Sequence, residues 1–116
     1  MELQRLTSLK DIKVGEIFTM ITSDFEDVVI QFIGRNPRIS NEEYKNKSGY
    51  FATVYGPKKC FILEEANLKS KDTEYYIGYD EKFALERRIE KIQNNLLAPL
   101  KERLLELEDR EFNNGN

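Results

Sequence analysis

Histidine and tryptophan are absent from this 116-residue chain, and cysteine occurs once, at Cys60. Without histidine, catalytic triads or dyads with an imidazole base are excluded, as are histidine-containing zinc, iron and copper sites. A single cysteine forms neither an internal disulfide nor a thiolate zinc site. No apolar run approaches the roughly 18 residues of a membrane-spanning helix, and because the first residues lack a basic start and an apolar core we expect no secretion signal. Lys or Tyr acid–base chemistry and a carboxylate-only metal site remain open. We nevertheless expect a non-enzymatic cytoplasmic protein without metal, cofactor or membrane contact.

Charge is nearly balanced overall but unevenly distributed. The chain holds 18 Lys and Arg against 21 Asp and Glu, a net charge of −3, which does not indicate a general nucleic-acid binder. Residues 34–59 carry six basic against two acidic side chains, or +4, and residues 102–111 carry two basic against five acidic, or −3. Residues 34–59 are a basic segment that could contact nucleic acid, but the chain as a whole is acidic. We therefore do not expect nucleic acid as the main partner.

Alternating and β-branched runs predict about five short strands between residues 12 and 79. They cover residues 17–22, 28–33, 50–55, 59–63 and 74–79, and the run at 28–33 is apolar on both faces, as in a central strand. Polar segments containing Gly and Pro separate them, including Gly56-Pro57, which predicts a hairpin. Because parallel pairs need long crossovers, these short connections predict an antiparallel sheet.

From Asp80 the apolar period changes to that of a helix. The side chains share spacings of three or four residues: Leu85, Ile89, Ile92, Leu96, Leu100, Leu104 and Leu107, called here the apolar stripe. We expect a single α+β domain over residues 1–116, with the sheet at 12–79, a helical segment at 80–112 and a frayed tail at 113–116. Pro99 predicts a kink in one long helix, and a hairpin of two helices turning at residues 94–99 is the alternative.

The helical segment is longer than the body that it follows. At about 1.5 Å per residue, a helix from Glu81 to Glu111 is roughly 45 Å long, whereas a compact chain of this size has a radius of gyration of about 13 Å. In one interpretation the stripe covers one face of the sheet. In the other, its first half packs on the sheet and its second half pairs with another copy, usually as a symmetric dimer. We therefore expect a homo-oligomer built through the C-terminal helix.

Two groups of residues indicate a ligand. Arg35 and Arg38 lie in a loop at a strand end, where guanidinium groups suit phosphate or carboxylate oxygens. Basic residues interleaved with tyrosines surround them, a pattern used to hold nucleobases and phosphates. Phe83, in the first helical turn, either fills the sheet–helix junction or stacks on a base. Arg110, near the end of the helix, is a third candidate for holding an anion.

The order of elements, with Tyr75-Tyr76-Ile77-Gly78-Tyr79-Asp80 leading into Glu81-Lys82-Phe83-Ala84-Leu85-Glu86, resembles phage Thoeris anti-defence proteins that sequester cyclic ADP-ribose signals. The resemblance implies that the C-terminal helices build the oligomer and that ligands sit where subunits meet. It also implies that Phe83 and Arg110 contact the nucleotide and that Asn94 or Asn95 supplies a polar contact.

Two functions follow as hypotheses. The first is a phage-type counter-defence protein that sequesters a nucleotide-derived signal in the host cytoplasm, with Arg35, Arg38, Phe83, Asn94 and Arg110 as ligand-binding residues. The second is a protein–protein inhibitor or adaptor whose acidic C-terminal helix docks on a basic surface.

Overall fold

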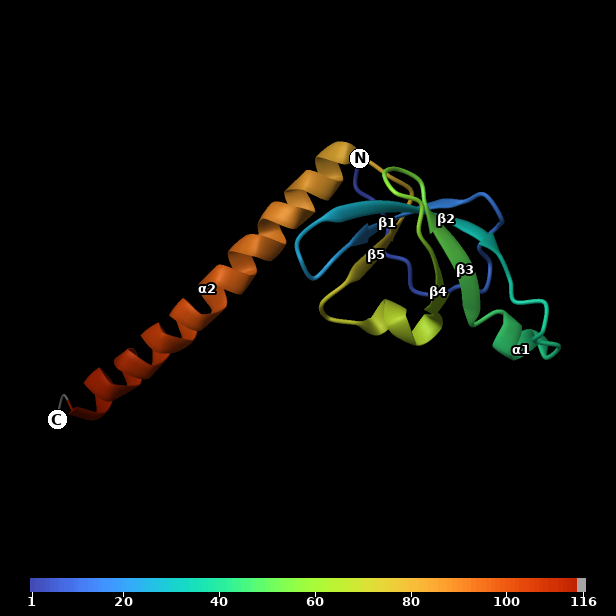
Figure 1. The fold of residues 1–116 in the computed structure, drawn as a ribbon. Coiled ribbons are helices and arrows are strands. Elements are labelled where there is room, and N and C mark those ends of the chain that lie inside the picture. Colours follow the sequence, from blue (N-terminus) through green and yellow to red (C-terminus); the bar gives the residue numbers. More distant parts are fainter. Residues whose placement is uncertain (115–116) are drawn as a thin grey trace.

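Five antiparallel strands form one sheet in the computed structural model, which describes residues 1–114 (Figure 1). The strands are β1 (Ile17–Ile21), β2 (Asp27–Gly34), β3 (Ser48–Thr53), β4 (Cys60–Glu64) and β5 (Glu74–Ile77). Their spatial order is β4-β3-β2-β1-β5, so β2 is central. The predicted antiparallel sheet, its central strand and the hairpin of β3 and β4 are confirmed.

One face of the sheet carries the main core, and its centre is aromatic. Phe51 lies against three other rings, with centroid distances of 5.9 Å to Phe18, 5.4 Å to Phe32 and 6.1 Å to Phe61. Leu6, Leu9 and Leu68 belong to the same buried cluster and come from segments outside the strands. The N-terminal segment and the 3₁₀ helix η1 (Glu65–Lys69) therefore close this face, and no long helix is needed there.

Gly49 is the position where this core is least tolerant of added volume. A Cβ atom at residue 49 would lie 2.6 Å from Cε1 of Phe32, closer than carbon atoms approach without displacement. Because Phe32 itself packs on Phe51, the ring has little room to move. We expect Gly49→Ala to lower the free energy of unfolding by about 1–3 kcal/mol. Urea unfolding would measure it, and a loss below about 0.5 kcal/mol would contradict this packing.

Two short helices replace stretches that the sequence pattern suggested to be polar connectors. Helix α1 (Glu42–Lys45) begins at Asn41, whose side chain accepts hydrogen bonds from the backbone N–H groups of Glu43 and Tyr44. Asparagine at this position is a common helix start. The other helix is η1, in the charged connector before β5. Both are short connections, α1 between β2 and β3 and η1 between β4 and β5, and neither adds a layer to the sheet.

The C-terminal helix α2 (Glu81–Asn114) is one element of 34 residues, about 51 Å long at 1.5 Å per residue. Pro99 lies inside it, and α2 is one uninterrupted helical ribbon (Figure 1). The alternative of a helical hairpin turning at residues 94–99 is therefore wrong. Of the tail expected to fray from residue 113, residues 113 and 114 belong to α2, and residues 115 and 116 lie outside the described part of the chain.

Helix α2 projects away from the sheet and gives the molecule an elongated shape. The extents are 69 × 32 × 25 Å and the Cα radius of gyration is 19.3 Å, against about 13 Å for a compact chain of this length (Figure 1). Only its first turns meet the body, where Ala84 and Phe83 pack with Ile21 and Tyr76. Within residues 1–114, no helix has an apolar stretch long enough to span a membrane.

The stripe does not face the sheet. Both interpretations from the sequence placed its first half against the sheet, and both are wrong on this point. Leu85, Ile89 and Ile92 remain 46%, 53% and 37% exposed, while Ala84 and Lys91 are the helical residues that the body buries. At about 100° per residue, the stripe and the contact face lie roughly 140° apart around the helix. Apolar side chains of the sheet are also partly uncovered, since Ile33 of β2 and Ile62 of β4 are 44% and 56% exposed.

Candidate functional site

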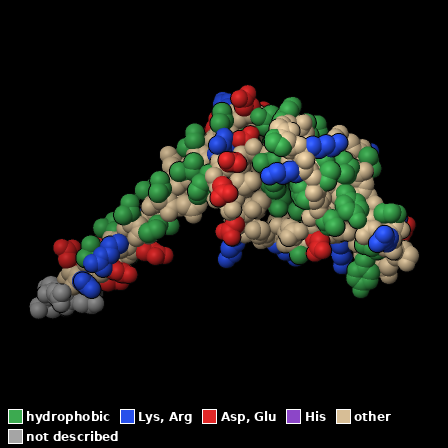
Figure 2. Space-filling model, in the orientation of Figure 1, with side chains coloured by type: hydrophobic (Ala, Val, Ile, Leu, Met, Phe, Trp, Pro, Cys, Tyr) green, Lys and Arg blue, Asp and Glu red, His purple; other side chains and the backbone are tan. Residues whose placement is uncertain are grey.

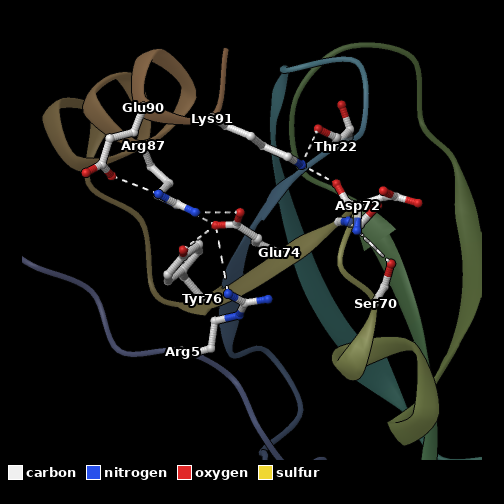
Figure 3. Close-up of polar contacts among 10 residues, drawn as sticks. Arg5, Thr22, Ser70, Asp72, Glu74, Tyr76, Arg87, Glu90 and Lys91 are labelled. Carbon is white, nitrogen blue, oxygen red and sulfur yellow. Dashed lines mark hydrogen bonds and ion pairs between the residues drawn. The ribbon is translucent and has the colours of Figure 1, made fainter. Parts of the chain in front are cut away.

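A buried carboxylate fixes the start of α2 to the edge strand β5. The Glu74 carboxylate accepts hydrogen bonds from Arg87 Nε at 2.6 Å, from Arg87 Nη2 at 2.8 Å and from the Tyr76 hydroxyl at 2.5 Å. Arg5 Nη1 lies 3.9 Å from the same carboxylate. Figure 3 shows these three side chains converging on Glu74 from the N-terminal segment, β5 and α2. The fork of Arg87 on Glu74 is bidentate, which fixes the rotation of α2 about its own axis.

A second set of contacts ties α2 to the loop between β1 and β2. Lys91 Nζ donates to the Thr22 carbonyl at 2.9 Å and to the Asp72 carbonyl (Figure 3). Arg88 donates to the Phe25 carbonyl at 2.5 Å and to Asp27 at 2.8 Å. Phe25 has a φ of +64°, a backbone conformation that bulky residues rarely adopt. The helix thus meets the body mainly through charged side chains, and this places its apolar face outward.

Acid is expected to weaken this junction. Burial raises the pKa of Glu74, but hydrogen bonds from Arg87 and Tyr76 and the charges of Arg87 and Arg5 outweigh it, so the pKa lies below its usual value. A carboxylate with a depressed pKa in the folded state stabilises the fold above its unfolded pKa, near 4.3, and loses this contribution as the pH falls through the folded value. The difference in urea midpoint between the wild type and Glu74→Gln should therefore shrink as the pH falls below about 4.3. A difference that stays constant to pH 3 would contradict this role.

The stripe is the largest feature of α2 that the protomer leaves without cover. All seven side chains are exposed, by 37% to 67%, and Leu96 and Leu100 are the most exposed at 67% and 66%. Leu97 and Leu105 add further exposed apolar surface to the distal half. Figure 2 shows hydrophobic side chains along the projecting rod and charged ones gathered toward its tip. A continuous apolar surface of this length indicates an interaction site.

Two cavities lie beside the junction, and each includes one residue expected to bind a ligand. Phe83 lines a cavity of about 400 Å³, together with Met1, Lys82 and Arg87. Asn94 lines a smaller one of about 210 Å³ with Lys71, Lys91 and Arg87. Arg87 therefore borders both. Both cavities are mixed in charge: the larger holds three glutamates, and the smaller has Asp72 and Glu74 beside its basic groups and the amides of Asn94 and Asn95.

Arg35 has a structural role, which corrects the expectation that it holds phosphate. Its Nη1 donates to the Asn46 and Ser48 carbonyls at 3.4 and 2.9 Å, and its Nη2 donates to the Leu9 and Lys10 carbonyls. The guanidinium carbon lies 4.8 Å from the centre of the Phe32 ring. Partial burial lowers the pKa of Arg35. The side chain thus links the N-terminal segment to the start of β3, and both terminal nitrogens are already hydrogen-bonded.

The other expected ligand residues do not converge within one protomer. Arg38 is exposed in the loop after β2, and its backbone N–H donates to Asn36 Oδ1 at 3.0 Å. Phe83 packs edge-on against Tyr76, with a centroid distance of 4.9 Å. Arg110 is exposed near the far end of α2. Since 27 residues of helix separate Phe83 from Arg110, about 40 Å lies between them.

The basic segment 34–59 is also divided by the fold. Lys45 and Lys47 lie before β3, whereas Lys58 and Lys59 follow it in the turn to β4. The six residues of β3 separate the two pairs by about 20 Å. Of the interleaved aromatics, Tyr44 has its ring centre 6.0 Å from Lys47 Nζ. This division makes a single nucleic-acid groove from the segment less favourable.

The sequence does not predict the anchoring role of Glu74, Arg87, Arg88 and Lys91. The sequence does hold a signal, because Ala84, Arg88 and Lys91 share one helical face at spacings of four and three residues. An apolar stripe normally faces the core, so this pattern by itself favours solvent for the opposite, charged face. A small residue such as Ala84 amid charged neighbours indicates close approach to another element.

Comparison with known proteins adds no family assignment. The chain matches no protein-family model, no curated protein and no solved structure. Within the described residues, no three Cys, Asp or Glu side chains gather as a metal site. The structure defines the class of the protein as an α+β fold with a five-stranded antiparallel sheet and a long projecting C-terminal helix.

Proposed function

We propose that this chain is a non-enzymatic binding protein that assembles through α2 and holds a nucleotide-derived signal where its subunits meet. The observation that carries the proposal is the stripe, seven apolar side chains that the described protomer leaves 37% to 67% exposed. The approximate 40 Å between Phe83 and Arg110 adds support, because a ligand that touches both must be shared between copies. A phage-type counter-defence protein acting in the host cytoplasm would have this organisation.

The mechanism would be sequestration, with no bond broken in the ligand. Arg38 and Arg110 would hold phosphate through charge-assisted hydrogen bonds, and Asn94 would contact the ligand through its amide. Phe83 would stack on the base, which requires its ring to leave the edge-on contact with Tyr76 or to use its open face toward the 400 Å³ cavity. Cyclic ADP-ribose combines phosphates and an adenine ring and so fits this set of side chains.

Calorimetry and thermal unfolding with cyclic ADP-ribose isomers would test this function. Binding at 100 times the dissociation constant raises the free energy of unfolding by about 2.7 kcal/mol, an easily measured shift in melting temperature. Arg110→Ala should abolish the shift, and Lys101→Ala, also exposed on α2, should retain it. If no isomer gives heat or a shift with the assembled wild-type protein, the proposed ligand class is wrong.

The acidic tip of α2 supports a second candidate, a protein–protein inhibitor or adaptor. Residues 102–111 carry a charge of −3, and the side chains of residues 101–111 are all exposed. Such a tip would dock on a basic surface of a target protein. Purification distinguishes the two functions, since a sequestering protein should retain a small ultraviolet-absorbing molecule. An adaptor should instead retain a macromolecule, and retention should weaken with salt.

A further inference from the structure

The stripe is nearly symmetric about its own centre. Counted from Leu96, its members lie 4, 7 and 11 residues toward the N-terminus, at Ile92, Ile89 and Leu85. Toward the C-terminus they lie at 4, 8 and 11 residues, at Leu100, Leu104 and Leu107. A surface whose spacing reads almost the same in both directions is complementary to a copy of itself turned end to end.

From this symmetry we infer that two copies pair antiparallel along α2, with Leu96 against Leu96 at the centre. Ile92 then lies against Leu100, and Leu85 lies against Leu107. The inference rests on the proposed function only in taking a second copy as the partner, and it adds the direction and the register of the pair. The resulting seam of 22 residue steps is about 33 Å long.

The geometry of the protomer leaves this seam accessible. The contact face of α2, with Ala84 and Lys91, lies roughly 140° around the helix from the stripe, so the sheet does not obstruct an approaching helix. An antiparallel pair places the two sheets at opposite ends. Each distal half, which has no sheet of its own beside it, then lies along the proximal half of the other copy. The closed two-fold arrangement leaves no repeating open end.

Charge favours the antiparallel direction. Residues 81–96 hold four basic and three acidic side chains, or +1, and residues 97–111 hold three basic and five acidic, or −2. A parallel pair would set the two −2 halves side by side. An antiparallel pair sets each −2 half beside a +1 half, which lowers the repulsion along the seam.

The same register has a consequence for the ligand. It sets Arg110 of one copy opposite Lys82 of the other, beside the 400 Å³ cavity that Lys82 and Phe83 line. Two cations facing one another at each end of the pair would attract an anion between them, against the opposing charge of the three glutamates that line the same cavity. A ligand there would touch both copies, although the pairing itself does not require one.

Cysteine cross-linking in a Cys60→Ser background tests the direction and the register without any ligand. Leu96→Cys should form a disulfide dimer by itself on mild oxidation. Leu85→Cys and Leu107→Cys should each remain uncross-linked alone and should form a mixed dimer when combined. Lys101→Cys, which lies outside the stripe, should give no dimer and serves as the control.

Two outcomes would overturn the inference. Self-dimers of Leu85→Cys and of Leu107→Cys would show a parallel pair. The absence of dimers from Leu96→Cys and from the mixture, with circular dichroism like that of the wild type, would show that the stripe has no such partner. Failure of the cyclic ADP-ribose test alongside the expected cross-links would reject the ligand and keep the pair, so the two failures are distinguishable.

Discussion

Replacing Leu96 and Leu100 together by glutamate is expected to convert the assembly into 13.7 kDa monomers while the protomer stays folded. Both side chains are about two-thirds exposed in the protomer, so the sheet and its core lose nothing. In the pair, each change would bury charges at the centre of the seam, where no basic partner lies opposite. Burying an unpaired carboxylate is costly enough to prevent association.

The energy available to the wild-type seam explains why so small a change should suffice. Full burial of a Leu or Ile side chain contributes about 1.5–3 kcal/mol, and the fourteen side chains of two stripes are each about half exposed before pairing. The gross gain is then about 10–20 kcal/mol, against an association cost of about 4–15 kcal/mol. The surplus is modest, so two glutamates per copy exceed it.

Light scattering of Leu96→Glu/Leu100→Glu and of Lys101→Glu, an exposed position outside the stripe, gives the comparison. The first should have the mass of one chain and the second that of the wild-type assembly. Both should show the far-ultraviolet circular dichroism of a folded sheet. An assembly that survives the double substitution would place the interface elsewhere.

The second large effect is expected at Glu74, whose replacement by glutamine should lower the free energy of unfolding by about 2–4 kcal/mol. Glutamine keeps the shape of the side chain but removes its negative charge. The carboxylate that accepts hydrogen bonds from the Arg87 guanidinium and from the Tyr76 hydroxyl is then lost. Arg87 would remain beside a neutral, mostly buried side chain. For a domain of this size such a loss corresponds to a fall in melting temperature of about 10–20 °C.

Glu90→Gln is the matched control for this prediction. Its carboxylate accepts from the same arginine, at 2.8 Å from Arg87 Nη1, but the Glu90 side chain is 66% exposed. Exposed ion pairs contribute at most about 1 kcal/mol, so we expect a small change. Thermal unfolding of Glu74→Gln and Glu90→Gln compares the loss of stability at the buried and at the exposed carboxylate partner of Arg87. Equal losses would mean that burial of Glu74 does not determine the strength of the junction.

Much of the fold could be predicted from local patterns. The run Val28–Ile33 is β-branched and apolar on both faces, as expected for the centre of a sheet, and β2 lies there. The change of period at Asp80 marked the start of α2, where the Asp80 carboxylate accepts from the Phe83 N–H at 3.0 Å. Such signals depend on neighbouring residues alone, so the sequence is enough to read them.

The orientation of α2 could not be predicted in the same way, because it depends on which surfaces other segments have already filled. Leu6 and Leu9 near the N-terminus, with Leu68 from η1, close the aromatic face of the sheet, so the stripe is not needed there. The buried Glu74 then draws Arg87 toward β5, which turns the stripe outward. Likewise, the loop arginine Arg35 meets four carbonyls that are distant in the chain, and no local pattern shows this.

Sedimentation equilibrium of the wild-type protein across a dilution series tests the central claim most directly, namely that a second copy covers the stripe. We predict a mass of twice 13.7 kDa, about 27 kDa, or a multiple of it, that falls toward one chain only on strong dilution. A mass of 13.7 kDa at every concentration would contradict the account, because the stripe would then stay exposed to water.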